Sequence, residues 1–157
     1  MTMMALTTPP LHDACYRGSS KEVKKLLEEA EDVNEAMKSG FTPLMCACKV
    51  LGPKPGDDSL VAFLIESKAN VNAQDQLGNT ALHVACESVD SSNPLLPRGY
   101  HRLVDELIKA GADVNRANRL GQTPIFRAAF KGNAQGVALL PGAGAPPRRR
   151  RPQRQAG

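Results

Sequence analysis

Four cysteines carry the most reactive side chains in this sequence: Cys15, Cys46, Cys48 and Cys86. Cys46 and Cys48 have one residue between them, whereas the Cys-x-x-Cys pairs of zinc and redox sites have two, and no cluster of histidines lies near them in the sequence. Free cysteine is among the residue types most often buried. We therefore predict buried structural thiols, no metal site, and no disulfide in a reducing compartment.

The three histidines, His12, His83 and His101, do not complete a catalytic pattern. His12 and His83 each follow a leucine in a recurring motif, which indicates a structural role, and His101 is expected at the solvated start of a helix. We find no Ser/His/Asp or Cys/His arrangement, phosphate-binding loop or set of paired carboxylates. We therefore expect no catalytic residue, no cofactor and no enzymatic activity.

The positive charge is concentrated near the carboxyl end. The chain has 20 Lys and Arg residues against 16 Asp and Glu, a formal net charge of +4. Five of the basic residues lie in an acid-free tail: Arg148, Arg149, Arg150, Arg151 and Arg154. Without them, 15 basic and 16 acidic residues leave a net charge of −1.

Three interpretations of this tail are open. It is a solvated end without a role, a nuclear-import signal, or a weak and salt-dependent binder of anionic surfaces such as nucleic acid. No aromatic residue is interleaved with the arginines, so nucleic acid bases have no stacking platform there.

The remaining composition favours a protein inside the cell. No apolar run approaches the roughly 18–20 residues that span a membrane. The first residues, MTMMALTTPP, lack the basic and apolar regions of a secretory signal. Aromatic residues make up 4% of the chain, which suits thin layers of small side chains. We expect a cytoplasmic or nuclear protein without a membrane segment.

A turn-forming stretch occurs three times. Residues 111–124, GADVNRANRLGQTP, combine a glycine that can end a helix, Asp and Asn turn formers, a second glycine suited to positive φ, and a Thr-Pro pair that can begin a helix. Residues 68–81, KANVNAQDQLGNTA, repeat this pattern closely, and residues 30–43, AEDVNEAMKSGFTP, repeat it loosely. Each copy is expected to end one helix, turn the chain and start another.

The motif after each turn recurs in register. Its leucine position is filled by Leu11, Leu44, Leu82 and Ile125, at intervals of 33, 38 and 43 residues. A period of 33 residues, with insertions of 5 and 10 residues at 51–55 and 89–98, accounts for these intervals. With a Thr-Pro-Leu-His type of start and a Gly-Ala-Asp-Val-Asn type of end, the sequence resembles the ankyrin repeat family over about residues 10–145.

The resemblance implies an all-α repeat solenoid, with stacked helix-turn-helix units joined by β-hairpin-like loops. The repeats fall at about residues 10–36, 37–74, 75–117 and 118–145, between a disordered lead of residues 1–9 and the disordered Arg-rich tail of residues 146–157. Pro9 replaces the usual capping threonine, and Met45 replaces the usual histidine. Gly136 replaces a large apolar residue shortly before Pro141, which predicts a short or frayed last helix.

In ankyrin repeat arrays, hairpin tips and the exposed side of the inner helices bind proteins, so the resemblance implies a protein partner. The matching positions are Lys38, Ser39, Phe41, Lys49, Gln76, Leu77, Asn79, Glu87, Arg119, Leu120, Gln122, Phe130 and Lys131. Phe41, Leu120 and Phe130 either anchor a partner or pack against a neighbouring repeat. The insertion at 89–98, with Leu95 and Leu96, is either a neutral surface loop or a further contact element.

We expect a monomeric protein-protein interaction module that works as an adaptor, scaffold or inhibitor. The alternative is a basic-tailed nuclear or nucleic-acid-associated factor, in which the repeats serve as a platform. Charge placement separates the two hypotheses, because the nearly neutral repeat body favours a protein partner and only the arginine run favours nucleic acid.

Overall fold

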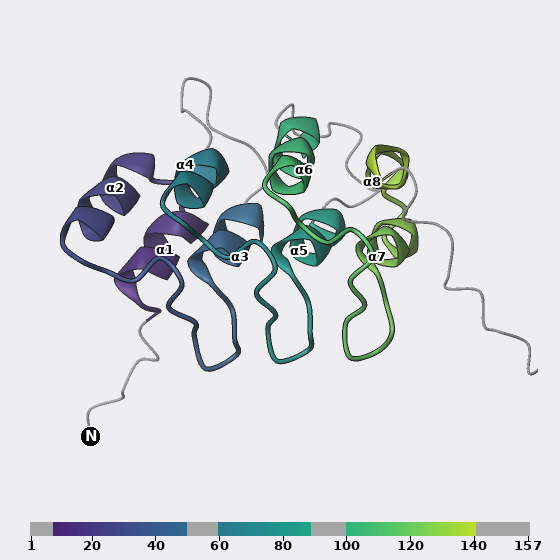
Figure 1. Ribbon diagram of the computed structural model, residues 1–157, viewed down its shortest axis with the longest axis horizontal. Helices are drawn as coiled ribbons and strands as arrows, with labels where there is room; N and C mark the ends of the chain where they lie inside the picture. Colours follow the sequence, from purple (N-terminus) through teal and green to yellow (C-terminus); the bar gives the residue numbers. More distant parts are fainter. Residues whose placement is uncertain (1–7, 50–59, 89–99, 141–157) are drawn as a thin grey trace, which may run out of the picture.

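The computed structural model describes residues 8–49, 60–88 and 100–140, which form eight helices in two rows (Figure 1). The inner row contains α1 (Pro10–Tyr16), α3 (Pro43–Lys49), α5 (Ala81–Glu87) and α7 (Pro124–Phe130). The outer row contains α2 (Ser20–Glu28), α4 (Leu60–Glu66), α6 (Tyr100–Lys109) and α8 (Ala134–Leu139). Each inner helix packs against the outer helix that follows it and against the next inner helix. The predicted all-α solenoid of helix pairs is therefore confirmed, and these ranges contain no strand.

Three hairpin-like loops project from the inner row toward one side (Figure 1). We name their ends tip 1 (residues 37–41), tip 2 (residues 75–79) and tip 3 (residues 118–122). In each tip the first amide donates a hydrogen bond to the carbonyl of the fifth residue, at 2.9, 2.9 and 2.8 Å. The fourth residue is a glycine with φ between 74° and 78°, as the turn pattern predicts.

Threonine begins the inner helices of the last three repeats. The Thr42 hydroxyl accepts from the Met45 amide at 3.3 Å, and the Thr123 hydroxyl accepts from the Phe126 amide at 3.4 Å. Pro9 takes this place before α1 and makes no side-chain cap bond. The helix starts predicted from the Thr-Pro pattern are thus present, and the first repeat begins with one capping group fewer.

The hydrophobic core lies between the two rows. Leu11, Leu44 and Leu82 occupy the recurring leucine position of the inner helices, and each is at most 1% exposed. The outer helices contribute the buried side chains Val23, Val61, Leu64, Val104 and Leu107. Because each repeat has only a thin apolar layer, burial depends on the neighbouring repeat.

The four cysteines are buried in this core, as predicted, and are 0–3% exposed. Burial raises the pKa of Cys15 and Cys86 to about 12 and the pKa of Cys46 to about 11. It also raises the pKa of the Cys48 thiol. All four side chains are therefore neutral thiols at physiological pH, in the structural role that the sequence predicts.

Histidine side chains connect successive repeats. His12 Nε2 lies 3.1 Å from the Phe41 carbonyl oxygen, and His83 Nε2 lies 2.9 Å from the Gln122 carbonyl oxygen. Met45, at the corresponding position of the second repeat, is 1% exposed, and its side chain has no N–H to donate. The structural role predicted for the two histidines is therefore confirmed.

Asparagine side chains form a second connection between repeats. Asn72 Nδ2 donates to the Gly111 carbonyl at 3.0 Å, and Asn72 Oδ1 accepts from the Asp113 amide at 2.8 Å. Asn34 makes the equivalent two bonds one repeat earlier, at 3.1 and 2.7 Å. From the sequence alone these positions belong to a turn, whereas the structure gives their side chains an inter-repeat role.

The last helix, α8, has six residues and is short, as predicted. Gly136 nevertheless has a packing role that the sequence does not reveal. A Cβ atom at this position would lie 2.6 Å from Asn133 Nδ2 and 2.7 Å from Tyr100 Oη. These two atoms are themselves joined by a hydrogen bond of 2.7 Å. Glycine therefore makes room for a buried polar pair, in addition to weakening the helix.

Several sequence predictions lie outside the described residues. They concern residues 1–7 of the lead, the insertions at 51–55 and 89–98, and the Arg-rich tail of residues 146–157. The longest helix, α6, has ten residues, and within the described ranges no helix has the length and apolar character needed to cross a bilayer.

Candidate protein-binding surface

The three tips form one connected row. The Gln76 amide donates to the Ser39 carbonyl at 2.9 Å, and the Arg119 amide donates to the Leu77 carbonyl at 2.9 Å. The Gln76 side-chain amide also donates to the Lys38 carbonyl. Successive tips approach so closely that a Cβ atom on Gly78 would lie 2.9 Å from the Arg119 backbone nitrogen. The side chains on the tips are therefore presented at a fixed spacing.

Tips 2 and 3 are held by their first side chain, and tip 1 is not. Asp75 Oδ1 accepts from the Leu77 and Asn79 amides at 2.9 and 2.8 Å. Asn118 Oδ1 accepts from two amides of tip 3 in the same way, at 3.0 and 2.9 Å. Met37 is the corresponding residue of tip 1, and its side chain has no oxygen to accept these bonds. Its side chain is half-buried and packs partly against the hydrophobic core.

Most of the predicted partner-binding residues are accessible. Leu77, Leu120 and Phe130 are 62%, 74% and 73% exposed. The other exposed members are Lys38, Ser39, Lys49, Gln76 and Arg119, and the half-buried members are Phe41, Glu87, Gln122 and Lys131. The structure thus places an extended set of apolar and basic side chains on the tips and the inner helices.

Asn79 differs from the others, because its side chain is buried and 8% exposed. Its Oδ1 accepts from Asn118 Nδ2 at 3.0 Å, so it holds tips 2 and 3 together. Glu87 is half-buried and pairs with the Arg127 guanidinium, and its other oxygen lies 4.0 Å from Lys131 Nζ. Asn79 is therefore not presented to a partner, and Glu87 and Lys131 are already engaged with each other and with α7.

The free charge of this surface is positive. The inner helices and tips contain three acids, Asp13, Asp75 and Glu87. Arg17 pairs with Asp13 at 2.7 Å and also with Glu22 of α2 at 2.9 Å, and the other two acids are held by tip amides and by Arg127. Three cations of the same elements have no ion pair within the described ranges: Lys38, Lys49 and Arg119.

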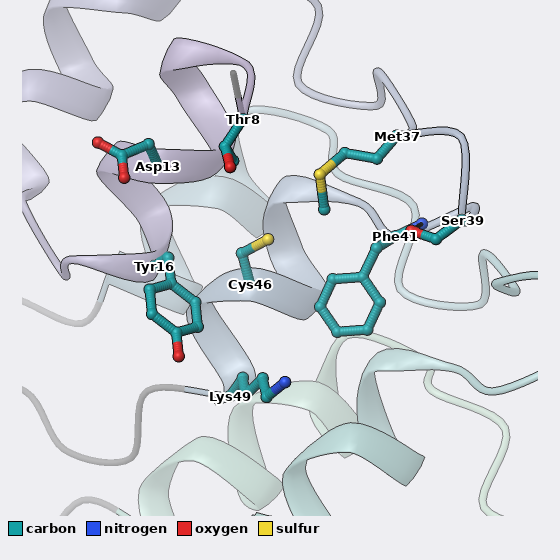
Figure 2. A pocket seen from close by; sticks show the side chains of 8 residues that line it. All are labelled: Thr8, Asp13, Tyr16, Met37, Ser39, Phe41, Cys46 and Lys49. Atoms are coloured by element: carbon teal, nitrogen blue, oxygen red, sulfur yellow. Dashed lines mark hydrogen bonds between the residues drawn. The ribbon is translucent and has the colours of Figure 1, made fainter. Parts of the chain in front are cut away.

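A pocket of about 380 Å³ opens on this surface between the first two repeats (Figure 2). We name it the α1–α3 pocket. It is lined by Thr8, Asp13, Tyr16, Met37, Ser39, Phe41, Cys46 and Lys49. In Figure 2 the Cys46 thiol lies between Tyr16 on α1 and Met37 and Phe41 on tip 1. Since burial raises the pKa of Cys46 to about 11, a neutral thiol is presented to the pocket.

The prediction from the sequence included three of these lining residues, Ser39, Phe41 and Lys49, and omitted the others. One signal was available, because Met37 interrupts the Asp/Asn pattern at the start of the tips. No comparable signal pointed to Tyr16, which is 52% exposed at the end of α1.

A second exposed apolar group lies on α7. The rings of Phe126 and Phe130 stack with centroids 6.4 Å apart and an angle of 12° between their planes. Phe126 occupies the position of His12 and His83, yet it is 49% exposed and they are fully buried. The sequence prediction included Phe130 and omitted Phe126.

Other chemistry is not evident on this surface. Within residues 8–49, 60–88 and 100–140, no group of three or more His, Cys, Asp or Glu side chains is placed to hold a metal ion. What the residues offer is apolar contact area, hydrogen-bonding groups and positive charge.

Paired helices in two rows and linked hairpin tips define a helical repeat solenoid. The family model described as Ankyrin repeats (3 copies) matches residues 53–150, and the chain belongs to the ankyrin repeat family. Residues before 53 form the same type of helix pair, α1 with α2, followed by α3. Ankyrin repeats generally bind other proteins.

The chain is similar to parts of several larger proteins. It is 36% identical over 126 residues to the mouse ankyrin repeat, SAM and basic leucine zipper domain-containing protein 1, a match that covers 80% of this chain and 24% of that protein. It is 32% identical over 142 residues to an intracellular phospholipase A2 of Caenorhabditis elegans, covering 90% of this chain and 13% of the relative. It is 31% identical over 134 residues to the tyrosine-protein kinase HTK16 of Hydra vulgaris, with coverage of 83% and 16%. This chain thus spans a quarter or less of the length of these relatives.

Proposed function

We propose that this chain is a non-catalytic protein-binding module, which works as an adaptor, scaffold or inhibitor by occupying a partner. Its contact surface would be the three tips together with the exposed side of the inner helices. The cytoplasm or the nucleus would be its place of action.

The observation that carries the proposal is the exposure of Leu77 on tip 2, Leu120 on tip 3 and Phe130 on α7, with tips 2 and 3 joined by a backbone hydrogen bond. Large apolar side chains on a rigid frame lose little conformational freedom on binding, which makes them efficient anchors. Positive charge from Lys38, Lys49 and Arg119 would speed the encounter with an acidic partner.

The test is affinity capture from cell lysate with the full chain and with a variant in which Leu77, Leu120 and Phe130 are all changed to serine. The three side chains are exposed, so the variant is expected to keep the fold and to lose the captured proteins. A matched control changes Lys21, Glu28 and Val137 to serine, because these residues are exposed on the outer helices. Equal capture by both variants would contradict the proposal.

The Arg-rich tail favours a second candidate, a nuclear or nucleic-acid-associated factor that uses the repeats as a platform. Five arginines within the seven residues 148–154 would give weak binding to phosphates that falls steeply with salt. The same capture is therefore repeated without residues 146–157 and after nuclease treatment. Loss of every captured protein under either condition would replace the first proposal with this one.

A further inference from the structure

We propose that the α1–α3 pocket anchors an acidic peptide segment of the partner, with one bulky apolar side chain in the pocket and carboxylates beside it. This inference rests on the proposed function and adds the chemistry of the partner. The occupant of the pocket is a segment of a partner protein.

The first argument is the departure of tip 1 from the pattern of the other tips. Asp75 and Asn118 use their side chains to bind the amides of their own tips. The Met37 side chain cannot accept such hydrogen bonds, and it lines the pocket. Phe41, the last residue of tip 1, lines the pocket beside it, at a position where tips 2 and 3 have Asn79 and Gln122. Tip 1 is therefore the only one of the three tips with an apolar residue at both ends.

The second argument is the chemistry of the pocket. Tyr16 and Phe41 face the space from opposite sides, with the Cys46 thiol between them (Figure 2). A volume of about 380 Å³ exceeds that of any single side chain, so an aromatic residue or a leucine can enter with part of its backbone. Methionine adapts to differently shaped apolar groups, which suits it to a pocket wall.

The third argument is charge. Asp13 is the one carboxylate among the residues that line the pocket, and it pairs at 2.7 Å with Arg17, which also binds Glu22 outside the pocket at 2.9 Å. Lys49 lies at the rim, and Lys38 is the neighbour of Met37 on tip 1. Neither lysine has an ion pair among the described residues. A segment with carboxylates next to its apolar anchor complements this arrangement.

The test uses a display library of random 12-residue peptides, selected for binding to the full chain. We expect the selected peptides to combine Phe, Trp, Tyr, Leu or Met with adjacent Asp or Glu. Met37→Asp should weaken the binding of a selected peptide by about tenfold or more, because it removes an apolar wall and adds a like charge. Lys49→Glu should weaken it by about threefold or more.

Met37→Asp introduces the residue type that tip 2 uses but removes a side chain that packs partly against the core, so its urea midpoint is measured beside its affinity to separate a loss of binding from a loss of fold. Tyr16→Ser provides a second variant on the opposite wall, at a side chain that is 52% exposed. Methyl NMR of methionine-labelled protein gives an independent readout. The Met37 methyl signal should shift on adding the peptide, and the signal of buried Met45 should stay in place.

Selected peptides without this composition, or with undiminished affinity for both Met37→Asp and Tyr16→Ser, would overturn the pocket proposal. So would a library that yields no binder. Peptides that instead lose affinity when Leu77, Leu120 and Phe130 are changed would place binding elsewhere on the surface and leave the proposed function intact. The proposed function fails only if the capture experiment described above fails as well.

Discussion

At the scale of single residues, His83 shows how one side chain couples two repeats through its protonation state. Its Nδ1 accepts from the Thr80 amide at 3.1 Å, so the ring proton is on Nε2, which donates to the Gln122 carbonyl at 2.9 Å. Burial lowers the pKa of His83 below its ordinary value of 6.5. A proton on Nδ1 would remove the acceptor that the Thr80 amide needs.

This arrangement predicts a loss of stability in mild acid. In the unfolded chain His83 takes up a proton near its ordinary pKa, and in the folded chain only at lower pH, so the unfolded state binds more protons in between. The free energy of unfolding contributed by His83 is therefore complete above about pH 6.5 and falls as the pH drops through the folded pKa. Urea unfolding at about pH 7.5 and about pH 5.5 measures the change.

The matched variant is His83→Met, because the second repeat already has methionine at this position. It should be less stable than the natural chain at neutral pH and should lose less stability on acidification. An identical pH dependence in both proteins would show that His83 is not the titrating group.

Gly136 leads to a prediction in which packing opposes helix propensity. Alanine forms helices better than glycine by about 1 kcal/mol. The added Cβ would, however, lie within 2.7 Å of both Asn133 Nδ2 and Tyr100 Oη, which are buried and bonded to each other. We expect Gly136→Ala to lower the free energy of unfolding by about 1–3 kcal/mol, measured by urea titration.

Ala138→Gly is the control for helix propensity, because Ala138 is exposed on the same helix. It should cost about 1 kcal/mol or less. If Gly136→Ala stabilised the chain, the glycine would be a weak point of a decaying repeat and the packing explanation would be wrong.

At the scale of elements, the hairpin segments hold the repeats together as well as turning the chain. Asn72 bonds to the end of the following outer helix and to the amide of Asp113. Asn115 occupies the same place in the next copy of the turn and is exposed. We expect Asn72→Ala to cost about 1–2 kcal/mol of unfolding free energy and Asn115→Ala to cost about 0.5 kcal/mol or less. Equal losses of stability in the two variants would show that the inter-repeat bonds of Asn72 do not stabilise the fold.

The helices were predictable from the sequence because their signals are local. A Thr-Pro pair marks the start of α7 and a glycine with positive φ ends α6 within a few residues of chain. The α1–α3 pocket was only partly predictable, since Tyr16 on α1 and Met37 on tip 1 line it from different repeats. The packing role of Gly136 was unpredictable for the same reason, because Tyr100, which would contact a side chain at this position, belongs to another helix.

At the scale of the whole molecule, the main packing contacts of each described helix are with its neighbours in the two rows. Such an array opens from its ends, because an end helix has lost one of its stacking partners. We expect amide hydrogen exchange of residues 104–108 in α6 to be much slower than that of residues 137–139 in α8. Equal protection of the two segments would indicate a single cooperative unit.

The buried cysteines have a further consequence for how this molecule can be followed over time. Alkylating reagents attack the thiolate, and the native chain presents four protonated thiols that are 0–3% exposed. Modification therefore records opening events. Cys46 is set apart because its thiol faces the α1–α3 pocket, which leaves Cys15 to report on the first repeat, Cys48 on the second and Cys86 on the third. The order in which mass spectrometry finds Cys15, Cys48 and Cys86 alkylated therefore reports the order in which the first three repeats open. No labelling site has to be introduced, because the native cysteines serve as the probes.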